Sequence, residues 1–318
     1  MPKQNGRPTD SPEVRASKTL AYILRHGAEK EGLAIRSDGL VKLADVMARP
    51  KVKDIDESTI FRLVADNSKK RFALVWGYDP SPPKPKKRSQ PKKTKTAAIA
   101  ESGAVEEVTR ALQVISVEPE WKELEFIKLS PPLSAFPDPE LVAAYEGGEV
   151  DGQSDERAEW FIRAVQGHTL KLDSGHLEEL IDDENGRQKA GLLVHGTKWQ
   201  LWDTISALDT QAPADSSGDT GLNKMQRQHI HLAPALTGRI TPRNQSSLLV
   251  YLDMPKMLAA GIPVYVAQNG VVLTPGKEGV VTNHFFRKVV SINRDKRRVI
   301  WENGAPSDRD EQPDEDVV

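Results

Sequence analysis

The 318-residue sequence contains no cysteine, which excludes disulfide bonds, thiolate metal ligands and cysteine nucleophiles. It also lacks an apolar run long enough to span a bilayer, and the segment from Met1 to Asp10 lacks the apolar core of a signal peptide. Aromatic residues amount to only 6%, and the net charge of −2 indicates nothing about nucleic acid. We therefore expect a soluble intracellular protein, cytoplasmic or nuclear, with no membrane partner.

Composition divides the chain into four parts. We expect a compact region at 11–80, a basic linker with a low-complexity insertion at 81–157, a second compact region at 158–302 and an acidic disordered tail at 303–318. Seven lysines and arginines lie between Lys84 and Lys95 with no acidic residue among them. This segment predicts an exposed tether that is either a solvated linker, a nuclear-import signal or a phosphate-binding arm.

The first compact region reads as helical with a terminal strand. Ser11 predicts the start of its first helix, whose apolar stripe leaves Arg25 and His26 on the opposite face of the last turn, and Gly27 can end it. Cations are favoured at a helix C-terminus in any case, so this pair by itself is not diagnostic. The further elements expected are a turn at Ser37–Gly39, helices at Leu43–Met47 and Asp56–Asn67, and a strand at Arg71–Val75. Three helices and a β-wing predict a winged-helix module.

The second compact region is richer in strands. Strands are expected at Trp160–Val165, Leu192–His195, Gln228–Ala233, Leu248–Leu252, Val264–Ala267 and Val271–Thr274. Short helices are expected at His176–Asp182, Lys198–Ala207 and Pro255–Ala260. Asn269-Gly270 between two apolar runs predicts a hairpin turn. The predicted fold class is α+β.

Several spaced segments carry a resemblance to a known family. They are S-K-T-L-A-Y-I-L-R-H-G (17–27), S-D-G-L-V-K-L (37–43), K-K-R-F-A-L (69–74), R-A-V-Q-G-H-T (163–169), L-V-H-G-T (193–197), R-Q-H-I-H-L-A-P (227–234) and R-N-Q-S-S-L-L-V-Y-L-D (243–253), followed by N-G-V (269–271). In order and spacing the chain resembles the tRNA 2′-phosphotransferase family, apart from the long insertion. It departs from the family pattern in Asn-Gln-Ser-Ser after Arg243, where a serine-rich run is expected, and in Thr169, where the family has serine.

The resemblance implies an N-terminal winged-helix lobe joined to a C-terminal ADP-ribosyltransferase-like lobe that holds NAD. It also implies an enzyme that removes the splice-junction 2′-phosphate from ligated tRNA. The RNA phosphate attacks the ribose of NAD and expels nicotinamide, giving an ADP-ribosylated RNA 2′-phosphate. The ribose 2″-hydroxyl then attacks phosphorus, which releases 2′-OH RNA and ADP-ribose 1″,2″-cyclic phosphate.

The resemblance places the family's catalytic quartet on Arg25, His26, Arg71 and Arg243. These residue types suit the reaction, because the nucleophile is already an anion and the enzyme mainly has to hold it in position. Arginine grips phosphate oxygens with two parallel hydrogen bonds and remains charged. His26 alone among the four titrates near neutrality, and we assign it phosphate contact and a hypothetical proton transfer.

The resemblance also implies contacts to NAD. The matching positions are Gln166, Gly167, His168, Thr169, His195, Gly196, Thr197, His231, Asn269 and Gly270. A Rossmann-type site is not supported, because no G-x-G-x-x-G follows a strand. His229 and His231 share one face of a strand and could form a metal site with His195, but we expect no metal.

Two other functions remain open from the sequence. The enzyme could stop after the first step and ADP-ribosylate phosphorylated nucleic-acid ends, or the chain could be a non-catalytic winged-helix nucleic-acid-binding protein. In the leading interpretation the partner is RNA with an internal 2′-phosphate, bound by a monomer mainly through its backbone. Arg15, Lys18 and Arg36 are the candidate contacts outside the basic tether.

Overall fold

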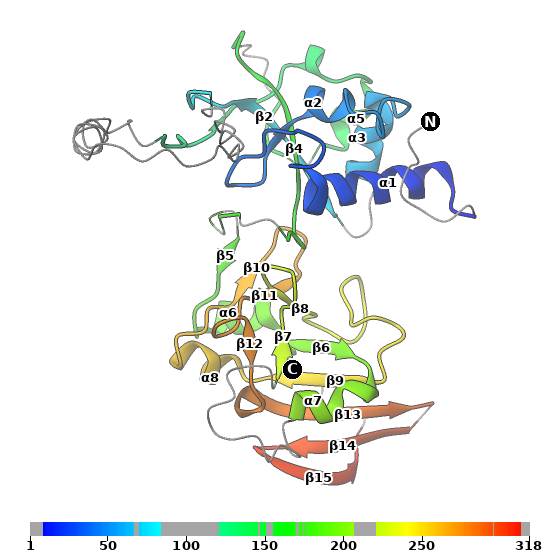
Figure 1. Ribbon diagram of the computed structural model, residues 1–318, viewed down its shortest axis with the longest axis vertical. Coiled ribbons are helices and arrows are strands. Elements are labelled where there is room, and N and C mark those ends of the chain that lie inside the picture. Colours follow the sequence, from blue (N-terminus) through cyan, green and yellow to red (C-terminus); the bar gives the residue numbers. More distant parts are fainter. Residues whose placement is uncertain are drawn as a thin grey trace, which may run out of the picture.

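The computed structural model describes residues 9–66, 70–83, 121–145, 147–150, 155–169, 172–173, 175, 177–206, 221–294 and 296–312. The basic segment between Lys84 and Lys95 lies outside these residues. Two lobes follow one another along the long axis of the molecule, the first mainly helical and the second mainly of strands (Figure 1). Among the described residues, no helix is long and apolar enough to cross a membrane.

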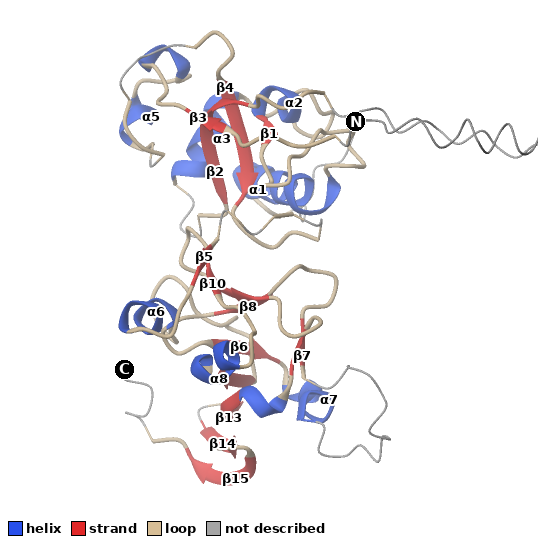
Figure 2. Cartoon of the chain, turned by 90° about the vertical axis from the view of Figure 1, so that its left-hand side faces the viewer, coloured by secondary structure: helices blue, strands red, loops and turns tan. Residues whose placement is uncertain are grey.

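The first lobe surrounds an antiparallel four-stranded sheet of order β1-β4-β2-β3. Figure 2 shows the helices around this sheet from the side. Its elements in chain order are α1 (Pro12–Tyr22), a π-helical turn η1 (Ile23–Gly27), β1 (Val41–Lys42), α2 (Leu43–Met47), α3 (Glu57–Ala65), β2 (Phe72–Tyr78), β3 (Ile127–Lys128), a 3₁₀ turn (Leu133–Ala135), α5 (Glu140–Ala143) and β4 (Glu159–Ala164).

The helices predicted in the first lobe are confirmed, and the reasons are local. The Ser11 hydroxyl accepts a hydrogen bond from the Val14 amide at 3.3 Å, and the Asp56 carboxylate caps α3 through the Thr59 amide at 2.6 Å. Leu20, Ile23 and Leu24 are fully buried, as their spacing predicts. Burying this stripe fixes the rotation of α1 and leaves its other face toward solvent.

The strand predicted at Trp160–Val165 forms as β4, but it lies in the sheet of the first lobe. It pairs with β2 over six residue pairs, from Phe72↔Ala164 to Gly77↔Glu159. Aromatic packing explains this position, since the Trp160 ring contacts Phe61 and Phe136 edge to face and its indole N–H donates to the Ala135 carbonyl at 2.7 Å. Described residues of the 81–157 segment thus complete the first core.

The second lobe is built from three antiparallel sheets of order β5-β10-β11-β8, β12-β7 and β15-β14-β13-β9-β6. An isolated bridge between Val194 and Ala233 joins the first and third of these sheets. The strands are β5 (Glu178–Glu179), β6 (Val194–Thr197), β7 (Leu222–Asn223), β8 (Ile230–Leu232), β9 (Leu248–Leu252), β10 (Tyr265–Val266), β11 (Val272–Thr274), β12 (Val280–Val281), β13 (Phe286–Asn293), β14 (Lys296–Glu302) and β15 (Ala305–Asp310).

Helices of the second lobe are short, and the fold class α+β is confirmed. The helices are α6 (Glu184–Ala190), α7 (Trp202–Ser206) and α8 (Met254–Ala259), with 3₁₀ turns at Trp199–Leu201 and Asn283–Phe285. The helix expected at His176–Asp182 is wrong, because Glu178–Glu179 pairs with β10 as a strand. The helix starts later, where the Asp183 carboxylate caps it through the Gly186 amide at 2.6 Å.

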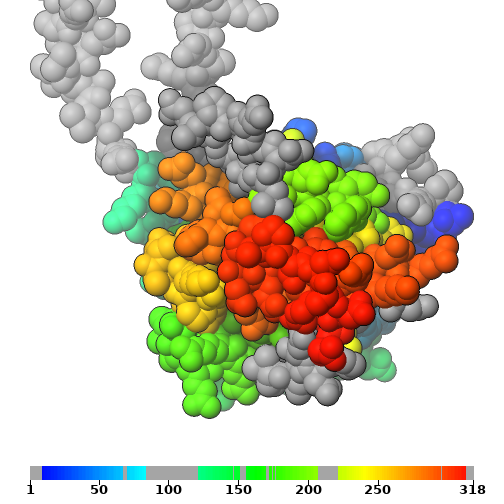
Figure 3. Space-filling model, turned by 90° about the horizontal axis from the view of Figure 1, so that it is seen from below, coloured from blue at the N-terminus to red at the C-terminus, as the bar shows by residue number. Residues whose placement is uncertain are grey.

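The acidic tail is ordered further than its composition suggests. Ala305–Asp310 forms the edge strand β15, which pairs with β14, so disorder was wrong for these residues. The Glu311 carboxylate is buried between Lys288, 3.0 Å away, and Arg297. Cations on β13 and β14 therefore neutralise acidic residues of the tail, and this allows the segment to pair as a strand. The last described residues, in red, form a continuous part of the lower surface (Figure 3).

Candidate active site

The site begins at the C-terminal end of the first helix. There α1 passes into the π-helical turn η1, a rare geometry that occurs mainly at functional sites. Within η1 the Ile23 and Leu24 side chains are buried, Arg25 is half-buried and His26 is exposed. The turn ends at Gly27, where a Cβ atom would lie only 2.9 Å from the Tyr22 ring. Glycine at this position therefore allows the close packing of the turn.

The Gln166–Thr169 loop after β4 lies directly against this turn. The Thr169 amide donates to the Arg25 carbonyl at 3.1 Å, and its hydroxyl donates to the same oxygen at 3.3 Å. The Thr169 hydroxyl oxygen also lies 3.2 Å from His26 Nδ1. Because the hydroxyl proton is used on the carbonyl, the oxygen accepts from Nδ1–H, which orients the His26 ring and leaves its Nε2 outward.

Gly167 in the same loop has φ +87°, and a Cβ there would lie 3.5 Å from the guanidinium group of Arg25. Glycine is favoured at this φ, and it lets the backbone lie flat along the arginine. Arg25 Nε is buried without a hydrogen-bond partner among the described residues, and so is Gln166 Oε1. The described residues thus leave the hydrogen-bonding capacity of both atoms unused.

Arg71, immediately before β2, completes a pocket of about 450 Å³ with Arg25 and His26. The structure thus brings three members of the predicted quartet together, from two elements of the first lobe. The remaining lining residues belong to α1 and are Val14, Ser17, Lys18, Ala21 and Tyr22.

Electrostatics of this pocket are dominated by positive charge. Burial, with the charges of Arg71 and Arg227, lowers the pKa of Arg25 to about 10. Burial also lowers the pKa of Arg71, and burial with Arg25 and Arg227 lowers that of His26. Among the described residues, no carboxylate is a cause of the lowered pKa of Arg25 or His26, so an anion that enters the pocket would offset the charge of these partly buried cations.

Arg227 is a member of this cluster that sequence reasoning did not nominate. Burial and the charge of Arg243 lower the pKa of Arg227. Arg243, the fourth member of the predicted quartet, therefore interacts with the cluster through Arg227. Arg243 itself is exposed in the loop before β9. The available signal was its position directly before the predicted strand Gln228–Ala233, which carries His229 and His231; in the structure Arg227 lies in a bend before β8.

His195 and His231 lie side by side behind the cluster. His195 Nδ1 donates to the His231 carbonyl at 3.0 Å, and His231 Nδ1 donates to the His229 carbonyl at 3.2 Å. Burial and nearby arginines lower the pKa of His195, and burial followed by Arg227 lowers that of His231 to about 3. Both rings are therefore neutral at pH 7, with Nε2 as the hydrogen-bond acceptor.

The other predicted cofactor positions lie in two separate places, one beside the Arg243 loop and one at the hairpin between β10 and β11. Gly196 and Thr197 lie beside the loop that carries Arg243, since a Cβ at Gly196 would meet Ser246 Oγ at 2.5 Å and the Thr197 carbonyl accepts from the Ser247 amide at 2.9 Å. The predicted Asn269-Gly270 hairpin is confirmed between β10 and β11. Asn269 is buried there and lines a different pocket, against the first lobe.

Two further expectations concern individual side chains. Arg36, a candidate RNA contact, is buried and forms ion pairs with Asp38, Asp79 and Glu123, so the structure contradicts that role. His168 is buried after β4, and its carbonyl accepts from the Gln228 amide at 3.1 Å. Within the described part of the chain, no group of three or more His, Asp or Glu side chains is arranged to hold a metal ion.

The α+β fold thus holds a pocket lined by Arg25, His26 and Arg71, and such a cluster of cations is suited to an anionic ligand. Comparison with known proteins makes this specific: the family model described as RNA 2′-phosphotransferase, Tpt1/KptA family, matches residues 11–276, and the chain belongs to this family. It is therefore a transferase.

Named relatives agree with that assignment. A probable RNA 2′-phosphotransferase of Agrobacterium fabrum is 40% identical over 262 residues, which cover 81% of this chain and 87% of that protein. The tRNA 2′-phosphotransferase 1 of Danio rerio is 27% identical over 290 residues, 90% of this chain and 88% of the relative. Its human counterpart is 27% identical over 285 residues, 88% and 76% respectively.

Proposed function

We propose that this chain removes an internal 2′-phosphate from RNA, such as that left in ligated tRNA, with NAD as co-substrate. The observation that carries the proposal is the cationic pocket, in which Arg25, His26 and Arg71 meet and Arg227 connects them to Arg243. A phosphate dianion matches this charge. Arginines offer it paired donors in a partly buried place where such contacts are strong.

Catalysis in this proposal depends on holding charge in position. The 2′-phosphate needs no general base, so Arg25 and Arg71 would grip its oxygens and aim it toward the second lobe. His26, oriented by the Thr169 hydroxyl at 3.2 Å, would present Nε2 to the phosphate. Its lowered pKa leaves Nε2 unprotonated in the free protein. The charge of a bound phosphate dianion would raise that pKa, so that Nε2–H donates to a phosphate oxygen and can give up its proton in the second step.

Residues of the second lobe fit a dinucleotide co-substrate. The Gln166 Oε1 and Ser246 Oγ atoms are buried without partners among the described residues, and a Cβ at Gly196 would lie only 2.5 Å from Ser246 Oγ. Arg227 and Arg243 would contact its phosphates, with Nε2 of His195 and His231 as acceptors for ribose hydroxyls. When bound, NAD supplies the ribosyl carbon that receives the RNA phosphate.

The architecture of the two lobes is part of the proposal. The first lobe, expected at 11–80, has three helices and a small sheet that fit a winged-helix module, and the second, expected at 158–302, fits an ADP-ribosyltransferase-like lobe. Pairing of β4 with β2 favours extending the first lobe through Val165. The Gln166–Thr169 loop would then connect the two lobes across the site.

The test is turnover of a short RNA with one internal 2′-phosphate, with and without NAD. We expect nicotinamide, ADP-ribose cyclic phosphate and 2′-OH RNA, with a loss of roughly 10²-fold or more in Arg25→Ala and Arg71→Ala. Arg187→Ala is the matched control, because Arg187 is exposed on α6 and pairs with Asp182.

Two other results would contradict the proposal in different ways. An RNA that keeps a stable ADP-ribosyl group would identify an ADP-ribosyltransferase of phosphorylated ends. RNA binding without release of nicotinamide would identify a nucleic-acid-binding protein whose second lobe does no chemistry.

A further inference from the structure

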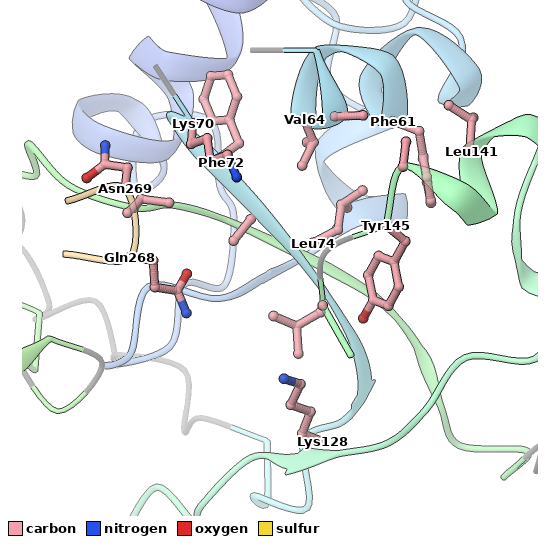
Figure 4. A pocket seen from close by; sticks show the side chains of 16 residues that line it. Phe61, Val64, Lys70, Phe72, Leu74, Lys128, Leu141, Tyr145, Gln268 and Asn269 are labelled. Carbon is pink, nitrogen blue, oxygen red and sulfur yellow. The ribbon is translucent and has the colours of Figure 1, made fainter. Parts of the chain in front are cut away.

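A second pocket, of about 360 Å³, lies on the other side of the start of β2 and has no part in the proposed reaction. We name it the β2-edge pocket. It is formed by α3, by β2, by residues of the segment from Lys128 to Gly147 and by the turn at Gln268–Asn269 from the second lobe (Figure 4). Lys70 and Phe72, the neighbours of Arg71, both line it, so one residue of chain separates it from the cationic pocket.

The pocket exposes backbone hydrogen-bonding groups. Arg71 directs its carbonyl to β4, where it accepts from the Val165 amide at 2.9 Å, and Trp76 directs its carbonyl to the opposite edge, to the Leu129 amide at 3.0 Å. Backbone groups of successive strand residues alternate between the two edges. Phe72 and Leu74 therefore direct their N–H and C=O groups away from β4, into the pocket.

On the edge of β2 away from β4, no described strand pairs with these two residues. The partner on that edge, β3, pairs only with Gly77 and Tyr78. Buried backbone groups without partners are costly, so this short open edge favours a ligand that offers donors and acceptors side by side.

The side chains that line the pocket indicate which class of ligand it could bind. Apolar side chains such as Phe61, Val64 and Leu74 dominate the walls. Tyr145 Oη is buried without a partner among the described residues, and burial raises its pKa, so it remains a donor. Lys128 is exposed at the rim and forms no ion pair with any described residue. Figure 4 shows Tyr145 and Lys128 directed into the pocket, with Gln268 across from them.

We propose that the β2-edge pocket binds a nucleobase that carries a phosphate group. The edge of a nucleobase presents a donor and an acceptor in one plane, and it can continue the plane of the sheet beside Phe72 and Leu74 while apolar side chains cover its faces. Lys128 and Tyr145 Oη then receive the phosphate. The cavity volume is within the range of sites for small ligands.

An added peptide strand fits the same edge poorly. Among the described residues of β2, only Phe72 and Leu74 have open backbone groups on this edge, because the Trp76 carbonyl accepts from Leu129 and the Arg71 carbonyl faces β4 and accepts from Val165. Strand addition needs a longer row of free groups. The positive rim also favours a phosphate over an extended peptide.

The nucleobase and its phosphate can come from two sources. One is a nucleotide of the RNA strand that crosses the site, and the other is a free mononucleotide. In either case the ligand touches the first lobe at β2 and the second lobe at Gln268–Asn269. Its binding therefore acts on the relative position of the lobes that carry Arg71 and Arg243.

The first experiment is calorimetric titration of the full chain with AMP. We expect saturable binding that weakens about tenfold in Lys128→Glu and roughly threefold to tenfold in Tyr145→Phe. Tyr145→Phe should not lower the melting temperature, because the hydroxyl has no partner in the protein to lose. Lys122→Glu, an exposed lysine of the same segment, is the matched control and should bind AMP normally.

Absence of saturable binding would overturn the proposal. So would AMP affinity that is equal in all four proteins, since the nucleotide would then occupy another site. Neither result depends on catalysis, so each is distinguishable from a failure of the proposed function.

The second experiment identifies the source and rests on the proposed function. Turnover is compared for a 2′-phosphorylated dinucleotide and for longer RNAs. If Lys128→Glu raises KM only for the longer RNAs, the pocket holds a base of the substrate strand. If KM is unchanged while AMP binding is weakened, the ligand is a free mononucleotide.

Discussion

At the scale of single residues, the site is defined by partly buried cations, whose pKa values are lowered by burial and, for Arg25 and Arg227, also by neighbouring arginines. Arg25 and Arg71 are half-buried in one pocket, and Arg227 extends their field to the histidines of the second lobe. Repulsion among these partly buried cations destabilises the free protein, and a bound polyanion would offset that repulsion. Strongly perturbed groups that gather in a pocket are typical of functional sites.

Arg227 gives the first prediction. Arg227→Ala should lower kcat/KM by roughly 10²-fold, because a donor to the developing charge is lost. It should also raise the pKa of His26, whose proton Arg227 repels. Steady-state kinetics and an NMR titration of His26 check the two effects. A fall in activity with an unchanged His26 pKa would show that Arg227 acts elsewhere.

His231 gives a second prediction, on the dependence of stability on pH. Its pKa is about 3 in the folded chain and 6.5 when unperturbed, so the unfolded state binds the extra proton below pH 6.5. Neutral His231 thus contributes stability above pH 6.5 that is lost as the pH falls toward 3, about 2 kcal/mol by pH 5. Urea denaturation of His231→Asn at several pH values should show a shallower loss, and an identical slope would contradict this assignment.

At the scale of elements, the π-helical turn and the Gln166–Thr169 loop form one unit. Without the loop, the His26 ring would be free to rotate. Without the turn, Thr169 would lose the Arg25 carbonyl that accepts its hydrogen bonds. Two hydrogen bonds from Thr169 to the Arg25 carbonyl and a third contact to His26 join them. Substituting the hydroxyl therefore tests the unit.

Thr169→Val should lower kcat by about tenfold while Thr169→Ser stays near the parent value, because serine keeps the hydroxyl. The expected change is in kcat more than in KM, since orientation of His26 matters most during the reaction. Equal effects of valine and serine would show that volume, and not the hydroxyl, is important at this position.

The edge strand β15 illustrates how an acidic sequence becomes ordered. Glu311→Ala should lower the free energy of unfolding by about 3 kcal/mol, because it removes a buried carboxylate that forms an ion pair with the buried Lys288 ammonium. Asp308→Ala is the control, because the Asp308–Arg298 pair is exposed and contributes well under 1 kcal/mol. Thermal denaturation of both variants measures the difference, and equal melting temperatures would refute it.

At the scale of the whole molecule, the two lobes meet where both pockets lie. The cationic pocket is formed by η1, α1 and Arg71, while Arg227 and Arg243 approach from the second lobe. The β2-edge pocket lies against the Gln268–Asn269 turn of the second lobe. A movement of one lobe thus changes both pockets together.

Much of this arrangement follows from the sequence alone. Local rules predicted α1, α3 and the Asn269-Gly270 hairpin, since caps, apolar spacing and turn residues act over a few positions. Motifs in register indicated the family and its quartet. Those rules have no information on strand partners. For this reason Trp160–Val165 was grouped with the second region, whereas β4 pairs with β2, and a helix was expected at His176–Asp182, where Glu178–Glu179 forms a strand.

Only the tertiary structure decided which distant residues meet. Contact of Thr169 with His26, the position of Arg227, the burial of Arg36 in a carboxylate network and the pairing of Glu311 with Lys288 each join segments far apart in the chain. Desolvation and charge coupling arise only after the chain has folded, so pKa values and pockets cannot be read from spacing. The sequence determined the kinds of residue and their local elements, and packing of the two lobes determined which of them share a site.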